Sequence, residues 1–190
     1  AQADLMELGS RLGASFDVIE SVGVLHHLAD PLAGWRVLLS LLRPSGFMKL
    51  GFYSEVARRN IVRIRTLIAE QGYNSTVEDI RQCRQDLMDL DESADFGTTI
   101  KSSDFFSIST CRDLLFHVQE HRMTLASIDA FLRENNLVFL RFEINAPILQ
   151  NYKQHFPNDS AATNLEQWQM FENENPNIFL GMYQFWIQKQ

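Results

Sequence analysis

Several features are scarce in this sequence of 190 residues, and each absence excludes a class of protein. Only two cysteines, Cys83 and Cys111, are present, which is too few for a disulfide framework or a thiolate metal site. We therefore interpret both as buried thiols and expect a protein of the reducing cytoplasm. No run of about 18 apolar residues is available to span a bilayer, and residues 1–8 have neither the basic start nor the apolar stretch of a signal peptide.

Positive charge is also in short supply. Lysine and arginine number 17 against 24 aspartate and glutamate residues, which gives a formal net charge of −7. Nucleic acids and anionic membranes are bound through clustered positive charge, so this balance argues against both and favours a soluble partner or a small molecule. Six arginines do gather on two predicted helices: Arg58, Arg59, Arg63, Arg65, Arg81 and Arg84. A basic patch could bind phosphate or nucleic acid, but we favour solvated helix faces paired with nearby acids: Glu55, Glu70, Glu78 and Asp79.

The sequence predicts a strand–helix–strand unit near its N-terminus. The apolar, β-branched run at 16–22 is typical of a strand buried on both faces of a parallel sheet. Asp30 and Pro31 supply an N-cap and a first helical residue, and apolar residues follow at helical spacing. The turn at 44–46 ends that helix, and a second strand is predicted at 47–53. The pattern indicates an α/β fold in which the two strands are parallel neighbours or near neighbours.

The rest of the chain alternates between helical and extended patterns. Between 54 and 123 the sequence predicts two helices, a loop and an apolar, partly helical region, at about 56–72, 75–90, 91–104 and 111–122 respectively. Beyond these, two helices and two strands are predicted: a helix at about 124–135, a strand at 137–144, a helix capped at 163–166 and an aromatic-rich strand at 179–188.

Residues 20–27 lie where an open parallel sheet collects its ligands, at the carboxyl end of a strand. Each of them has an ordinary structural explanation when taken singly, as strand core or as a hydrogen-bonded histidine. The longer string is more specific: Phe-Asp-Val-Ile at 16–19 is followed by Leu-His-His-Leu-Ala-Asp-Pro at 25–31 and by Leu-Leu-Arg-Pro-Ser-Gly at 41–46. It resembles the class I S-adenosylmethionine-dependent methyltransferases, departing from their pattern only by Ser45 in place of the first glycine.

The resemblance implies a Rossmann-like methyltransferase sheet that is incomplete at its N-terminal half and carries a helical insertion. Residues 1–53 would form a partial core, from the end of the family's third strand to its fifth. Residues 54–123 would be the helical insertion that covers the acceptor side, and residues 124–190 the last helix and antiparallel strand pair that complete the sheet.

The same resemblance implies S-adenosyl-L-methionine as the cofactor. Asp4 matches the acidic residue that accepts a hydrogen bond from the adenine amino group, and Leu5 would bind adenine beside it. The backbone of four residues would line the methionine portion: Ser21, Val22, Gly23 and Val24. The family's Gly-rich loop and ribose-binding acid have no counterpart, because the glycines at 9 and 13 follow no strand and open no helix. We expect both to lie upstream of residue 1 and the isolated chain to be inactive.

For catalysis, the resemblance implies direct methyl transfer to an O or N acceptor whose identity the sequence leaves open. His26 or His27 is the candidate general base, because an imidazole can accept a proton near neutral pH. Tyr53, at the end of the next predicted strand, could flank the acceptor.

A rival hypothesis comes from His117, Glu120 and His121, which fit the H-x-x-E-H pattern of inverted zinc-protease helices. Histidines four apart share one helix face, and a third ligand would have to come from a downstream acid: Glu166, Glu172 or Glu174. We favour the simpler interpretation that His117 and His121 orient an acceptor or hold the insertion to the sheet, with no metal.

Two further expectations concern partners. The chain could be a non-catalytic interaction module that keeps a methyltransferase shape without binding the cofactor. If the preceding strands are absent, the strand at 16–22 has an exposed edge, which dimerisation, strand exchange or aggregation would cover.

Overall fold

A computed structural model describes residues 4–12, 16–90, 96–116 and 120–190 of the chain. These residues belong to two compact units. Unit 1 comprises Ala1–Ala57 and His121–Gln190, and unit 2 comprises Arg58–Glu120. Within the described ranges, none of the helices is both long enough and apolar enough to cross a membrane.

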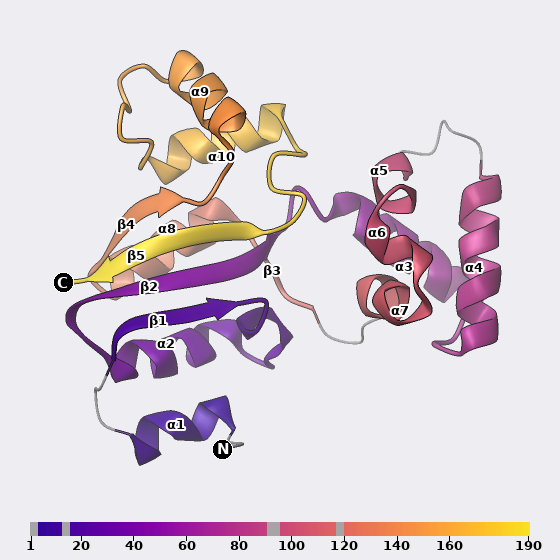
Figure 1. The fold of residues 1–190 in the computed structure, drawn as a ribbon, viewed down its shortest axis with the longest axis horizontal. Coiled ribbons are helices and arrows are strands. Elements are labelled where there is room, and N and C mark those ends of the chain that lie inside the picture. The colour runs from indigo at the N-terminus through magenta and orange to yellow at the C-terminus, as the bar shows by residue number, and fades with distance from the viewer. Residues whose placement is uncertain (1–3, 13–15, 91–95, 117–119) are drawn as a thin grey trace. The chain divides into compact units, whose positions relative to one another are not determined.

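Unit 1 is built on a mixed, five-stranded sheet. Four strands follow one another across it in the order β1 (Phe16–Val22), β2 (Leu42–Ser54), β5 (Tyr183–Lys189) and β4 (Leu137–Phe142) (Figure 1). The first two are parallel, as the strand–helix–strand pattern predicts, and the last two are antiparallel to each other. The short β3 (Arg122–Met123) pairs in parallel with the last two residues of β2. The carboxyl ends of β1, β2 and β3 therefore point the same way.

One face of this sheet is covered by α2 (Pro31–Leu41) and α8 (Leu125–Glu134). The indole ring of Trp35 stacks on Phe131 with 4.0 Å between ring centroids, so the two helices lie side by side. Trp35 also contacts Phe52 of β2, at 5.4 Å between centroids. The helix starts follow from local chemistry: the Asp30 carboxylate caps α2, and Thr124 forms a capping box at the start of α8.

Ser45 occupies the one position where the chain departs from the family pattern, and its φ is 62°. This left-handed backbone geometry normally favours glycine. Because β2 already begins at Leu42, the turn predicted to end α2 instead lies within the strand.

The opposite face of the sheet carries a row of polar groups. Lys49 of β2 forms ion pairs with Glu20 of β1, at 3.3 Å, and with Glu143, at 2.8 Å. Trp186 of β5 donates its indole N–H to Glu143 at 2.8 Å. The hydrogen bond to Glu143 is the main cause that raises the pKa of Lys49, and the same bond lowers the pKa of Glu143.

Two helices of unit 1 are absent from the sequence prediction: α1 (Leu5–Arg11) and α9 (Ala146–His155). α1 packs against α2. α9 pairs with α10 (Leu165–Glu174), which begins at an Asn164 cap one residue later than predicted. The α9–α10 contact is a stack of Tyr152 on Trp168, with ring centroids 3.8 Å apart.

Unit 2 is helical in its described parts. Its helices are α3 (Arg59–Gln71), α4 (Val77–Asp89), α5 (Gly97–Ile100), α6 (Ser103–Phe106) and α7 (Ile108–Phe116). The predicted loop at 91–104 is thus wrong over its second part, where α5 and α6 begin; residues 91–95 lie outside the described residues. Cys83 and Cys111 are both buried in the apolar core of this unit. Burial raises the pKa of the Cys83 thiol to about 12 and also raises that of Cys111.

Four of the six arginines that gather on the predicted helices make contacts that the sequence does not predict, while Arg63 and Arg81 are exposed as expected. Arg58 and Arg65 instead meet Glu120, at 3.9 and 3.0 Å. Arg63 and Arg84 lie over aromatic rings, those of Phe96 and Phe105 respectively. These contacts follow from the chemistry of arginine, because a flat guanidinium group can stack on an aromatic ring or pair with a carboxylate such as that of Glu120.

Strand β1 is more exposed than a strand buried on both faces would be. Phe16 is 43% exposed and Val18 is 55% exposed. Among the described strands β1 pairs with β2 alone, which leaves its other edge without a backbone partner. An apolar edge of this kind is a template for pairing with another chain.

We therefore expect residues 1–190 to self-associate through β1. Changing Val18 to Lys places a charge on this edge, which should increase the monomer fraction measured by light scattering relative to the 21.9 kDa chain mass. The matched control is Met170→Lys on α10, an equally exposed apolar residue away from the edge. A wild-type chain that stays monomeric at high concentration would contradict the prediction.

Candidate functional site

The backbone turns sharply at the carboxyl end of β1. Gly23 has a φ of 77°, and a short 3₁₀ turn at Leu25–His27 follows it. A Cβ built on Gly23 would meet nothing within 4 Å, so space is open beside this turn. The hydroxyl of Ser21 just before it is buried and has no hydrogen-bond partner within the part of the chain that the structure describes. An open turn beside an unsatisfied polar group suits a ligand that carries polar groups of its own.

Three of the predicted catalytic and acceptor residues come together after this turn. The Nε2 atoms of His26 and His27 lie 3.0 Å apart, so one nitrogen carries the hydrogen and the other accepts it. The His26 ring lies 4.3 Å from the Tyr53 ring, between centroids. The backbone N–H of His121 donates to the carbonyl of His26 at 2.9 Å. His121 thus joins the group, whereas His117 lies outside the described residues.

The two histidines differ in access. His26 has no exposed surface, while His27 is partly exposed. Only His27 of the pair is therefore reachable by an acceptor that arrives from solvent, and its contact with His26 restrains the orientation of its ring. The sequence cannot distinguish the two, because both follow the same strand with the same chemistry.

A buried carboxyl, which the sequence suggested only as a possible zinc ligand, lies at the same end of β2. Glu172 of α10 is 0% exposed. It accepts hydrogen bonds of 2.5 Å each from the hydroxyls of Ser54 and Tyr183. Ser54 in turn accepts the backbone N–H of Ala57 at 3.0 Å. One signal was available in the sequence: Glu172 follows Trp168 by four residues, which places an acid on the apolar face of its helix.

The predicted adenine-binding residues lie at the start of α1. Asp4 is exposed and caps the helix, because its carboxylate accepts the backbone N–H of Met6 at 2.9 Å. Leu5 is half-buried and packs against the core of unit 1. The cap engages one carboxylate oxygen and leaves the other available to a ligand.

The structure overturns the zinc-protease hypothesis. That motif needs all three residues on one helix, but α7 ends at Phe116, and Glu120 and His121 are not helical. Glu120 is instead paired with Arg65 at 3.0 Å. Among the described residues, which do not include His117, no three His, Cys, Asp or Glu side chains are placed to hold a metal ion.

The fold of the chain is thus an α/β fold with a mixed five-stranded sheet, and it resembles part of a methyltransferase structure. Two solved structures that the chain resembles are of PKMT2, a protein lysine methyltransferase, from Rickettsia typhi. In complex with AdoHcy, PKMT2 matches with a TM-score of 0.70 at 14% identity, over 98% of this chain and 38% of that chain. A second structure of PKMT2 matches with a TM-score of 0.68 at 13% identity, over 96% of this chain and 37% of that one.

Sequence comparison adds a short match. An uncharacterised protein of Synechococcus sp. is 42% identical over 60 residues, which cover 32% of this chain and 14% of that protein. No protein-family model matches the chain. In both comparisons the chain spans well under half the length of the protein that it matches.

The Glu172 network generates a prediction about pH. Burial raises the pKa of Glu172, against the effect of its hydrogen bonds. Because its carboxyl pKa is raised, the folded state binds the proton more tightly than the unfolded state does. Protonation of Glu172 therefore stabilises the fold fully below the unfolded pKa of about 4.3. This stabilisation is lost as pH rises through the folded pKa. Glu172→Gln removes this titration. Relative to the variant, the wild type should lose unfolding free energy as pH rises above about 4, as measured by urea denaturation.

The control for this experiment is Glu174→Gln, which changes an exposed acid on the same helix. It should leave the pH dependence of unfolding close to that of the wild type. Parallel curves for wild type and Glu172→Gln across the whole range would show that Glu172 titrates alike in the folded and unfolded states.

Proposed function

We propose that the chain is the C-terminal portion of an S-adenosylmethionine-dependent methyltransferase domain that transfers methyl to an O or N acceptor. One observation carries the proposal: the open Gly23 turn and the His26–His27 pair follow β1 at the end of the strand. The chain that contains them aligns over 98% of its length with a structure of an AdoHcy-bound enzyme. AdoHcy is the product that S-adenosylmethionine leaves after it gives up its methyl group. The structural similarity at 14% identity supports only the fold, so the proposed reaction rests on the residues at the site.

The residues present fit part of a cofactor site. Asp4 and Leu5 would hold the adenine, and the backbone from Ser21 to Val24 would hold the methionine portion beside the open space at Gly23. When bound, the cofactor supplies a methyl group activated by its sulfonium sulfur. A Gly-rich loop and a ribose-binding acid would come from the parent polypeptide.

The acceptor would enter beside His27 and Tyr53. His27 is partly exposed, and it would take the proton that an N or O acceptor loses as it becomes methylated. The buried His26 would act as a positioning residue, since its Nε2 contacts that of His27. A lysine amine is the first acceptor to test, because PKMT2 is a protein lysine methyltransferase. Such an amine must be uncharged to attack, which makes a nearby base useful.

The proposal is tested by titrating S-adenosylmethionine into the parent polypeptide and into residues 1–190 alone, by calorimetry. We expect the parent to bind and the isolated chain to bind weakly or not at all. In the parent, Asp4→Ser should weaken binding by about tenfold, the size of one hydrogen bond to a charged group. Serine keeps the N-cap of α1, so the loss reports the ligand rather than the helix.

The matched control is Asp30→Ser, which changes the capping aspartate of α2 in the same way. It should leave cofactor affinity unchanged. If neither the parent nor the chain binds, the non-catalytic interaction module becomes the better description of the protein. Equal losses in both variants would mean that helix capping, and not adenine recognition, explains the effect of Asp4.

A further inference from the structure

A groove lies between the end of β4 and the α9–α10 pair, away from the His26–His27 site in sequence. Its cavity of about 500 Å³ is lined by the strand end at 141–145 and by residues of both helices and their connection: Leu149, Lys153, Ala161, Ala162 and Trp168. A second hollow of about 480 Å³ on α9 shares Leu149 and Lys153 with the first. The two hollows therefore adjoin each other at Leu149 and Lys153 of α9.

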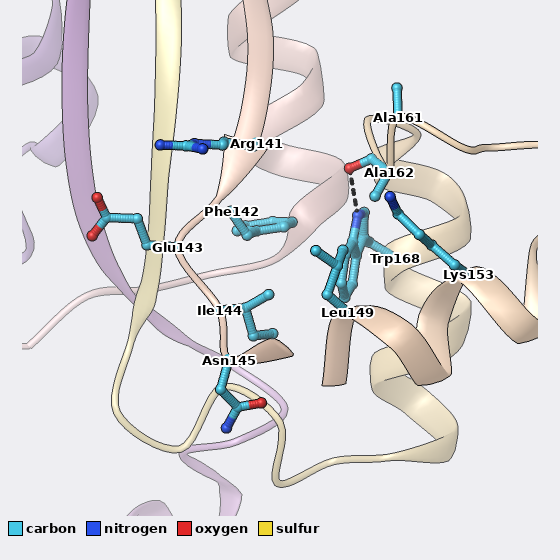
Figure 2. Close-up of a pocket in the computed structure, with 10 residues that line it drawn as sticks. All are labelled: Arg141, Phe142, Glu143, Ile144, Asn145, Leu149, Lys153, Ala161, Ala162 and Trp168. Atoms are coloured by element: carbon cyan, nitrogen blue, oxygen red, sulfur yellow. Dashed lines mark hydrogen bonds between the residues drawn. The ribbon is translucent and has the colours of Figure 1, made fainter. Parts of the chain in front are cut away.

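The side chains at the end of β4 point alternately toward the groove and away from it. Figure 2 shows Phe142 and Ile144 pointing toward Leu149 and Trp168, while Arg141 and Glu143 point to the other side of the strand. This is the alternation expected of extended backbone. The side chains that point toward α9 and α10 are therefore apolar, although Arg141, Glu143 and Asn145 also line the cavity. Glu143 forms an ion pair with Lys49.

Strand β4 has one edge that pairs with none of the described strands, because it ends the strand order and pairs with β5 alone among them. Phe142 faces Phe185 as a pair, and the adjacent hydrogen bond runs from the Glu143 N–H to the Gln184 carbonyl at 2.8 Å. In an antiparallel ladder this alternation points the N–H and C=O of Phe142 away from β5, toward the free edge.

The far wall is held rigidly. The indole N–H of Trp168 donates to the Ala162 carbonyl at 2.9 Å (Figure 2). Ala162 has a φ of 56°, a left-handed geometry that costs an alanine energy, and such strain concentrates where function requires it. Asp159 holds the same segment by accepting the Tyr152 hydroxyl at 2.6 Å and the Asn164 N–H at 2.9 Å. A wall fixed before binding lowers the entropy lost on binding.

Two cationic side chains line the groove, those of Arg141 and Lys153, and Lys153 belongs to the α9 side of it. The side chain of Lys153 is exposed and has neither a hydrogen bond nor an ion pair with any residue that the structure describes. In a chain of net charge −7, cationic side chains beside apolar side chains and an unpaired strand edge favour a partner that carries acidic groups.

We propose that this groove binds an extended segment of a partner protein, which adds as a strand to the edge of β4. Its backbone pairs with Phe142, an apolar side chain contacts the wall formed by Leu149 and Ile144, and an acidic side chain meets Lys153. The proposal stands apart from methyl transfer, since it uses none of the residues assigned to cofactor or acceptor.

The test uses a fluorescein-labelled peptide of alternating valine and glutamate and measures its affinity for the chain by fluorescence polarisation. Lys153→Glu should weaken binding by about tenfold or more, because it replaces an attraction with a repulsion. Lys101→Glu, at another exposed lysine, is the matched control and should change affinity by less than about twofold. A peptide of alternating valine and lysine should bind more weakly to the wild type and more tightly to Lys153→Glu.

Amide hydrogen exchange supplies the second readout. Saturating peptide should slow exchange at the Phe142 amide by about tenfold or more, since pairing at the edge protects it. Thermal melting of Lys153→Glu checks that the exposed substitution leaves the fold intact. Absence of binding up to millimolar peptide, equal affinity for the lysine peptide, or an unprotected Phe142 amide would each overturn the proposal; the last would indicate a side-chain contact without strand addition.

Discussion

The pairing of β2 along both of its edges fixes the positions of the groups that matter in unit 1. Parallel pairing with β1 brings the carboxyl ends of both strands to one edge, so His26 comes to lie beside Tyr53. Antiparallel pairing with β5 starts at the same edge and delivers Tyr183 to Glu172. The close fit depends on Gly51, where a Cβ would lie only 2.7 Å from the Val22 side chain.

Local signals account for the parts of the fold that the sequence predicts. The apolar run of β1 and the caps at Asp30 and Thr124 act within a few residues, and the elements begin where those signals place them. α9 was missed although Asn145 caps it and Pro147 lies in its first turn, because only Tyr152 of this helix is fully buried and its apolar repeat is short. The missed helices α5 and α6 have four residues each, too few for a periodic pattern to show.

The sequence predicted which residues gather at the candidate site, but not how they are buried or hydrogen-bonded there. The position of the histidine pair after β1 follows from the order of strand and turn. The burial of His26 does not, because it depends on contacts with Tyr53 and His121, which are remote in sequence. The hydrogen bond between Ser54 and Glu172 joins residues 118 positions apart, and no local pattern encodes it. The zinc hypothesis assumed a continuous helix, since a spacing of four implies a shared face only there, and Glu120 and His121 are not helical.

The ion pairs of Lys49 limit what can cover the sheet face opposite α2 and α8. A layer that packed there with only apolar side chains would strip water from Lys49, Glu20 and Glu143 together, and dehydrating a charged cluster costs more than its internal attraction returns. Whatever occupies that face in a larger assembly therefore has to bring hydrogen-bonding groups or trapped water to this spot. The charges on this face of the sheet thus restrict its possible neighbours to surfaces that carry polar groups.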